Sequence, residues 1–312
     1  MKTRLATITL WLSWALMGFS VAVLVFRWEP FLTYFYVYVW WAMIGIMDSR
    51  LYLQRGESLF WSKTGEFVTF LVPFSAFLWF GFELFNLRLG NWSYHNVPAS
   101  TPLRWAGNFA AFGTVVPGIF LIAETLDHAG IFQRNEFSRF FSGEIPKPLF
   151  WTCVVAGVAM LAAPLAFPGI FYSLVWGGWV LLLDPINARW GGDSLIQEWR
   201  QKNFNRTGQL LLAGLIAGFL WEFWNYWAGA RWAYHVPLPV WLGRDLKLFE
   251  MPLLGFLGFP PFALECFVMT QFARNLSERT PEKVRPILWV GMLVFGLWLC
   301  RLMDLYTVRS FR

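Results

Sequence analysis

Apolar stretches of about 20 residues recur along the whole chain and are separated by short polar segments. Each stretch is long enough to cross about 30 Å of hydrocarbon as a helix. The pattern predicts an all-α polytopic membrane protein with about nine transmembrane helices. The nine stretches are residues 5–27, 31–48, 66–86, 107–125, 149–166, 169–184, 208–227, 252–272 and 286–304. Composition agrees, because 14% of the residues are charged, against about 25% in soluble domains.

The basic residues fall mainly on one side of this predicted arrangement. Sixteen of the 25 Lys and Arg residues lie in the N-terminus and in the loops 49–65, 126–148, 185–207 and 273–285. Basic residues favour the cytoplasm, so we expect the N-terminus inside and the C-terminus outside a bacterial cytoplasmic membrane. The first apolar stretch is too long for a cleavable signal sequence. The net charge of +6 is explained by these loops beside anionic lipid, and no segment indicates nucleic-acid binding.

A polar pattern within the apolar chain occurs twice. Residues 82–98 read FELFNLRLGNWSYHNVP, and residues 221–237 read WEFWNYWAGARWAYHVP. The matched positions are Glu83 with Glu222 and Asn86 with Asn225, and then Trp92, Tyr94 and His95 with Trp232, Tyr234 and His235. Such a repeat predicts two copies of one structural unit.

The similarity extends on both sides of this pattern and sets the expected domains. We predict a first four-helix repeat at 1–147, a second at 148–285 and an appended C-terminal helix at 286–312. An even number of spans makes the two repeats parallel, so their pseudo-twofold axis should run along the membrane normal. The loop of the second half at residues 228–251 is longer than its first-half counterpart and is expected to form a structured cap outside the membrane.

The acids of the repeated pattern are the first candidates for chemistry. A charged side chain at the bilayer centre costs at least about 2.5 kcal/mol, so Glu83 and Glu222 should face a partner or a cavity. Asn86 and Asn225 lie three residues later on the same helix face and could orient them. In a dry site a neutral acid would be available as a proton donor. The alternative is a hydrogen bond between helices of the two copies.

Further acids also occur in matched pairs. Glu124 and Glu265 each follow a proline within a predicted span. They could act as second acids, or they could bind the carbonyl that a proline leaves free. Asp48 and Asp184 end their spans and are followed by arginines, which favours a structural ion pair or a helix junction.

Aromatic residues make up 20% of the chain and surround the acids. Aromatic faces stabilise cations, so an acid among them would suit protonation of an isoprenoid in a site that excludes water. The same surroundings would bind a lipid or a pigment without chemistry. The expected substrate-binding residues are Trp221, Trp224, Trp232, Tyr234, His235, Trp92, Tyr94 and His95.

No metal or other cofactor is predicted. His95 and His235 could ligate a metal or haem, but no third ligand lies near them in the sequence. Hydrogen bonding at the membrane interface is the alternative for both. The three cysteines all fall within apolar spans and form no CxxC motif. Motifs for nucleotide binding, nucleophilic hydrolysis and zinc proteolysis are absent from the sequence.

The second copy resembles the integral-membrane lycopene cyclase domain family of carotenoid biosynthesis. Trp221–Glu222 is similar to that family's acidic residue after a Trp near the end of a span. The run from Phe249 to Phe256, FEMPLLGF, is similar to its proline followed by paired glutamates and an aromatic residue. The resemblance implies isoprenoid chemistry without a cofactor. Leu254 and Gly255 stand where the family has the paired glutamates.

Three hypotheses follow from the sequence. The first is a membrane protein that binds a long isoprenoid or another lipid, acting as an enzyme through cyclase-, isomerase- or hydratase-like acid–base chemistry. Its catalytic residues would be Glu222, Asn225, Glu83, Asn86, Glu265 and Glu124. The second is a carrier or channel for an ion or small solute along the pseudo-twofold axis. The third is a non-catalytic subunit of a larger membrane assembly, whose protein partners the sequence does not identify.

Overall fold

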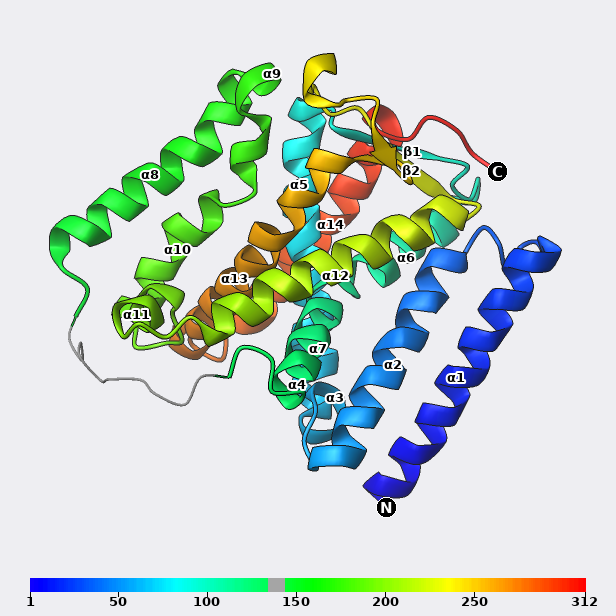
Figure 1. Ribbon diagram of the computed structural model, residues 1–312, viewed down its shortest axis with the longest axis horizontal. Helices are drawn as coiled ribbons and strands as arrows, with labels where there is room; N and C mark the ends of the chain where they lie inside the picture. The colour runs from blue at the N-terminus through cyan, green and yellow to red at the C-terminus, as the bar shows by residue number, and fades with distance from the viewer. Residues whose placement is uncertain (134–143) are drawn as a thin grey trace.

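Long apolar helices dominate the computed structural model, which describes residues 1–133 and 144–312 (Figure 1). The protein is mostly helical, at 74%. In the described residues, eight helical segments are long and apolar enough to cross a membrane. They are Lys2–Phe26, Thr64–Leu89, Thr101–His128, Lys147–Ala166, Pro168–Arg189, Asn205–Trp227, Leu253–Arg279 and Arg285–Tyr306. The expectation of a mostly helical chain with helices able to span a membrane is confirmed.

Several of these segments consist of more than one element. The single-element helices are α1 (Lys2–Phe26), α8 (Lys147–Ala166), α12 (Asn205–Trp227) and α14 (Arg285–Tyr306). The composite ones are α4 (Thr64–Glu66), η1 (Phe67–Leu71) and α5 (Val72–Leu89); α6 (Thr101–Phe112) and α7 (Val115–His128); α9 (Pro168–Phe171), η2 (Tyr172–Val175) and α10 (Gly178–Arg189); and η4 (Leu253–Gly258) and α13 (Phe259–Arg279).

One predicted span, 31–48, has no counterpart among the eight apolar segments. It corresponds to helix α2 (Phe35–Arg55). Its 21 residues are rich in Tyr and Trp and include Asp48, Arg50 and Arg55. The polar rings and charges lower its overall apolar character. Helix α2 packs beside α1 (Figure 1) and buries Trp40 in the core.

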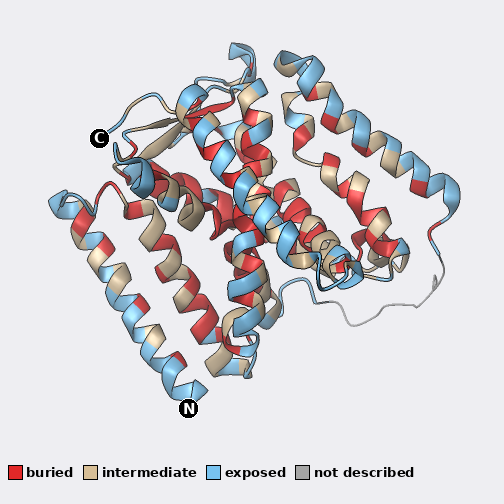
Figure 2. Cartoon of the chain, turned by 180° about the vertical axis from the view of Figure 1, so that it is seen from behind, coloured by how far each residue is buried: buried red, intermediate tan, exposed pale blue. Residues whose placement is uncertain are grey.

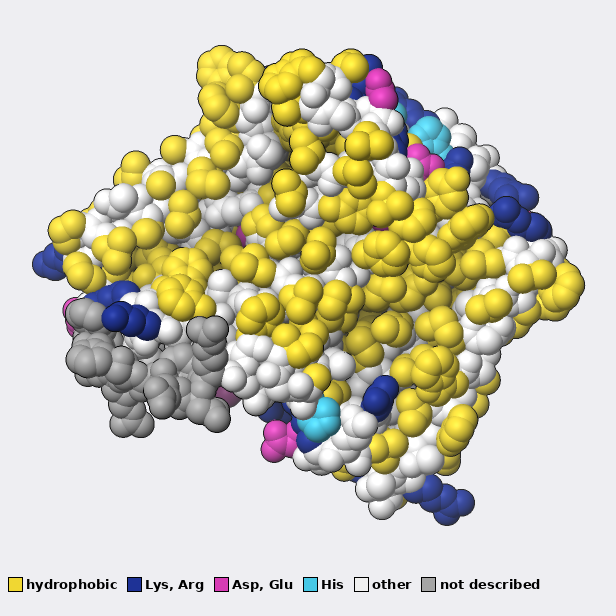
Figure 3. All heavy atoms as spheres, in the orientation of Figure 1, with side chains coloured by type: hydrophobic (Ala, Val, Ile, Leu, Met, Phe, Trp, Pro, Cys, Tyr) yellow, Lys and Arg dark blue, Asp and Glu magenta, His cyan; other side chains and the backbone are white. Residues whose placement is uncertain are grey.

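Lipid-compatible faces lie on the outermost helices. Figure 2 shows α1 and α8 with mostly exposed surfaces, and Figure 3 shows a broad hydrophobic surface over the same view of the molecule as Figure 1. Large apolar side chains such as Trp11, Val155 and Ile287 project from α1, α8 and α14. Exposed apolar surface of this extent is favourable when it meets lipid and costly when it meets water.

Two short helices follow α2 and α10 and are held by matching aspartates. Asp48 accepts a hydrogen bond from Ser58 Oγ at 3.0 Å, before α3 (Leu59–Ser62). Asp184 accepts one from Ser194 Oγ at 2.9 Å, before α11 (Leu195–Arg200). Each aspartate also binds backbone N–H groups of its loop. Both therefore serve helix junctions, which is one of the two roles expected for them.

A two-stranded ribbon joins the ends of α5 and α12. Strands β1 (Trp92–His95) and β2 (Arg231–Tyr234) are antiparallel, with Trp92 opposite Tyr234 and Tyr94 opposite Trp232. Because Trp92 and Tyr94 match Trp232 and Tyr234 in sequence, each Trp of one copy faces the Tyr of the other. The C-terminal tail pairs with the other edge of β1. Sequence analysis predicted loops here and missed the strands.

The segment expected to form a cap, residues 228–251, includes β2 and continues beyond it. Beyond β2 lie η3 (Val240–Leu242) and the short strands β3 (Lys247–Leu248) and β4 (Met251–Pro252), which pair with each other. The ribbon, this cap and the C-terminus lie at one end of the molecule, and the N-terminus lies at the other (Figure 1).

Candidate functional site

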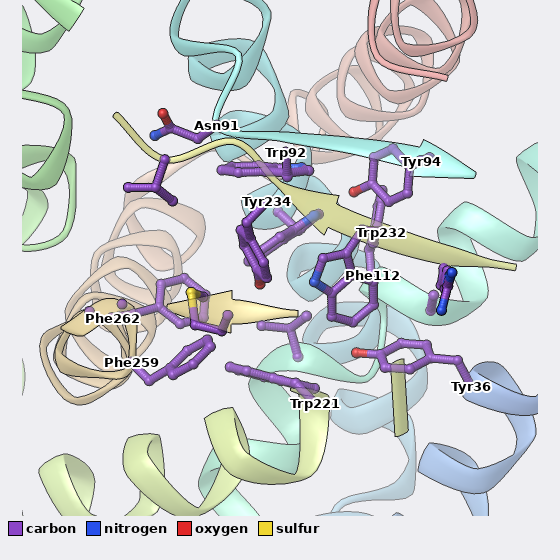
Figure 4. A pocket seen from close by; sticks show the side chains of 18 of the residues that line it. Tyr36, Asn91, Trp92, Tyr94, Phe112, Trp221, Trp232, Tyr234, Phe259 and Phe262 are labelled. Carbon is purple, nitrogen blue, oxygen red and sulfur yellow. The ribbon is translucent and has the colours of Figure 1, made fainter. Parts of the chain in front are cut away.

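The ribbon roofs a cavity of about 420 Å³. The side chains of Trp92, Tyr94, Trp232 and Tyr234 point from the strands into it, as Figure 4 shows. The facing walls carry aromatic side chains from several helices. These include Tyr36, Phe112, Trp221, Phe259 and Phe262. The volume lies in the range of about 300–1,000 Å³ that small-molecule sites occupy.

The cavity wall is overwhelmingly apolar, and its only charged lining residues in the described chain are Arg104 and Arg231. Arg104 is buried and binds both carboxylate oxygens of Asp304 at 2.7 Å. Arg231 lies 3.4 Å from a carboxylate oxygen of Glu250. Both cations are therefore committed to pairs, and no carboxylate lines the wall in the described residues.

Glu83 is not among the residues that line the cavity, and three donors hold it. Its Oε1 atom accepts hydrogen bonds from Trp79 Nε1 at 2.9 Å, from Trp92 Nε1 at 3.0 Å and from the Tyr94 hydroxyl at 2.5 Å. The side chain is fully buried, and its second oxygen has no partner among the described residues. The roof residues therefore separate Glu83 from the cavity.

Glu222, which matches Glu83 in sequence, also does not line the cavity and has fewer partners. Its Oε1 atom accepts one hydrogen bond, from the Tyr234 hydroxyl at 2.8 Å. In the described part of the chain, its other oxygen and the indole N–H groups of Trp221 and Trp232 have no partner. Buried polar atoms usually have partners, so the second copy has unused hydrogen-bonding capacity near the cavity.

Both tyrosines are held in their donating form. Burial raises the pKa of Tyr94 and of Tyr234 well above the ordinary value for a phenol, and the neighbouring glutamate raises each further. At neutral pH each hydroxyl therefore keeps its proton and donates a hydrogen bond to the glutamate. The groups that meet a ligand are then the tyrosines, and Glu83 and Glu222 position them.

Asn86 and Asn225 fix the strands to their helices. The amide of Asn86 donates to the Trp92 carbonyl at 3.0 Å and accepts from the Trp92 N–H at 3.1 Å. Asn225 makes the same pair of bonds to Trp232, at 2.9 and 2.8 Å. The amides, which we expected to orient the acids, thus anchor the strand that brings each tyrosine to its glutamate.

His95 and His235 lie on the opposite face of the ribbon from the cavity. Their Nε2 atoms lie 3.1 and 2.7 Å from the hydroxyl oxygen of Ser93. Neither histidine lines the cavity. The expectation that they bind the substrate there is therefore not met, because alternation along a strand directs them outward.

Three other predicted residues also lie away from the cavity wall. Trp224 packs edge-on against Trp40, with ring centroids 4.7 Å apart. Glu124 forms a close ion pair with Arg55 at the end of α2. Glu265 is fully buried and accepts from the Trp179 N–H at 3.2 Å, near the start of α10. The structure thus does not bring Glu124 and Glu265 together with the two glutamates that bond the ribbon tyrosines.

The run FEMPLLGF contributes wall rather than chemistry. Met251, Pro252, Leu254 and Gly255 all line the cavity. Leu254 and Gly255 stand where the resemblance would place paired glutamates, so this wall carries no acid.

Sequence reasoning missed several residues of the site. Trp79 lies four residues before Glu83, which places both on one helix face, so this donor could have been found by spacing. The rings of Tyr36, Phe112, Trp176, Phe259 and Phe262 reach the cavity only through packing of distant helices. No local signal distinguishes them from other aromatic residues in the core.

Comparison with models of protein families, with curated proteins and with solved structures finds no match. No group of three His, Cys, Asp or Glu side chains in the described ranges could hold a metal ion. The function is therefore argued from the geometry of this site.

Proposed function

We propose that this protein binds a long isoprenoid or another lipid chain in the aromatic cavity beneath the ribbon. One observation carries the proposal: the cavity has the volume of a ligand site, and its wall is apolar with both cations paired. An apolar chain gains roughly 25 cal/mol for each Å² of surface that leaves water. A carrier for ions would need polar groups along its path, and no carboxylate lines this cavity in the described residues.

The proposal includes a duplicated architecture around the cavity. The matched aspartate–serine junctions and the matched asparagine anchors support two copies of one unit. The ribbon register supports a pseudo-twofold axis that passes between Ser93 and Ala233, which face each other. The ligand would then lie across the junction of the two repeats, at 1–147 and 148–285.

Acid–base chemistry on the bound chain is the second candidate function. The hydrogen bonds from Tyr94 and Tyr234 to buried glutamates favour it, because both tyrosines line the cavity. Tyr234 would be the group in contact with substrate, and Glu222 would position it and share its proton. The second copy is favoured because the unpartnered indole N–H groups of Trp221 and Trp232 lie there.

Mass spectrometry of molecules retained after gentle purification tests the binding proposal. We expect a specific long apolar molecule at near-equal molar ratio, and a polyene would also show in the absorption spectrum. Extracts that contain only detergent and phospholipid in bulk membrane proportions would contradict the proposal.

A further inference from the structure

A second cavity adjoins the aromatic one at the ribbon end. Four residues border both cavities: Tyr234, Val236, Leu238 and Pro252. The second cavity has a volume of about 410 Å³ and is more open. The two cavities therefore adjoin at these four residues.

The second cavity differs from the first in charge. Its wall includes His235, Arg244 and Lys247, with Asp245 as the single acid among its described lining residues. Arg244 Nε lies 3.0 Å from Asp245 Oδ1, and Lys247 forms no ion pair within the described chain. Of the cations that line either cavity, Lys247 alone lacks a carboxylate partner there.

Further positive groups lie near His235. Burial lowers the pKa of His235, and the neighbouring His95, Arg309 and Lys247 lower it further. Lys247 also lines the same cavity as His235. Basic side chains gather at the upper right edge of Figure 3, where Figure 1 places the ribbon and the C-terminus.

We infer that the ligand is an anionic amphiphile, with its chain in the aromatic cavity and a phosphate or carboxylate head beside Lys247 and Arg244. This inference rests on the proposed function and specifies the ligand's chemical class. A charge-assisted hydrogen bond from Lys247 would hold the head. The chain would bury its apolar surface in the adjoining aromatic cavity. Arg104 and Arg231 are already paired, so the aromatic cavity itself offers no free cation for the head.

A matched pair of probes tests this inference: a C20 polyprenyl alcohol and the monophosphate of the same alcohol. Binding to the full-length protein in nanodiscs is measured by native mass spectrometry. We expect the monophosphate to bind about tenfold more tightly, as one charge-assisted hydrogen bond would give. Arg244→Gln/Lys247→Gln should reduce binding of the monophosphate to the level of the alcohol, and because both residues are exposed the substitutions should leave the fold intact.

The controls separate the possible failures. Lys283→Gln, in the loop between α13 and α14, should keep the preference. Excess inorganic phosphate should compete only weakly, because it lacks the chain; full competition would contradict an amphiphile. Equal binding of alcohol and monophosphate, or a preference that survives the double substitution, would overturn the head site and leave the proposed function standing. Binding of neither probe would overturn the proposed function as well.

Discussion

At the scale of single residues, the two buried glutamates have unequal support. Glu83 receives three donors on one oxygen, whereas Glu222 receives one. A buried acceptor left without its partner costs about 1–3 kcal/mol. The two tyrosine hydroxyls should therefore matter to different degrees, even though they occupy matched positions in the sequence.

Tyr234→Phe should lower the free energy of unfolding by about 1–3 kcal/mol, because Glu222 loses its single hydrogen bond. Tyr94→Phe should cost less, since two indole N–H groups still bind Glu83. Thermal unfolding in detergent measures both, with Tyr226→Phe on an exposed side chain as the control. Equal losses for the two tyrosines would count against the asymmetry.

His235 makes the stability of the folded protein depend on pH. Its pKa is lowered in the folded protein, so the unfolded chain binds more protons between the folded pKa and about 6.5. The free energy of unfolding is therefore unaffected by the titration of His235 above about pH 6.5, and it decreases as the pH falls below this value.

Wild-type protein should lose more stability than His235→Gln when the pH drops from 7.5 to 5.5. The depressed pKa reflects burial first and then the charges of His95, Arg309 and Lys247. Melting temperatures of both proteins across this range provide the measurement. An identical loss in the variant would show that another group causes the acid sensitivity.

At the scale of elements, the ribbon depends on anchors outside itself. An isolated two-stranded ribbon is at best marginally stable in water, and here each strand has four residues. Asn86 and Asn225 tie the strands to α5 and α12, and the C-terminal tail pairs with β1. The stability of the ribbon, and so of the cavity roof, therefore depends on these contacts.

Asn225→Ala should increase hydrogen exchange of the Trp232 amide, because that N–H loses its acceptor. Asn86→Ala should do the same to the Trp92 amide. Exchange mass spectrometry on ribbon peptides reads both effects. Asn205→Ala, whose side chain makes no hydrogen bond in the described structure, is the control. Ribbon exchange that stays at the wild-type rate in both anchor variants would remove the asparagines from this role.

The helices could be predicted from sequence, and the ribbon could not. Apolar runs of about 20 residues specify helices locally, and the predicted spans overlap the observed ones. The span 107–125 is instead two helices, broken at Gly113 and Thr114. Strand β2 lies about 140 residues from its partner β1, and no short hairpin turn marks such a pairing in the sequence.

At the scale of the whole molecule, the site forms where the two sequence copies meet. The repeated pattern indicated that the acids, amides and aromatic residues lie near one axis. The sequence could not show that Glu83 and Glu222 do not line the cavity, or that His95 and His235 lie on the other face of the ribbon. The register of the ribbon decides both. Glu124 and Glu265 match in sequence yet have different partners.

The ends of the molecule should face opposite sides of the membrane, because the N-terminus and the ribbon end lie far apart (Figure 1). The distribution of basic residues predicts a cytoplasmic N-terminus. In a chain whose three native cysteines are replaced, an impermeant maleimide on intact cells should label Trp241→Cys, which is exposed in the cap. Lys2→Cys should stay unlabelled until the cells are opened. The reverse pattern would invert the orientation.

The most direct test of the central claim is photolabelling with a diazirine-bearing polyprenyl chain. Gly107 lines the cavity, and an added Cβ there meets no atom within 4 Å, so Gly107→Phe should extend into ligand space. Gly291→Phe, on α14, is the matched control, because an added Cβ there also meets no atom within 4 Å. We predict adducts on cavity peptides, about tenfold fewer in Gly107→Phe and undiminished in Gly291→Phe. Adducts spread over the exposed faces of α1, α8 and α14, and unchanged by Gly107→Phe, would contradict a ligand beneath the ribbon.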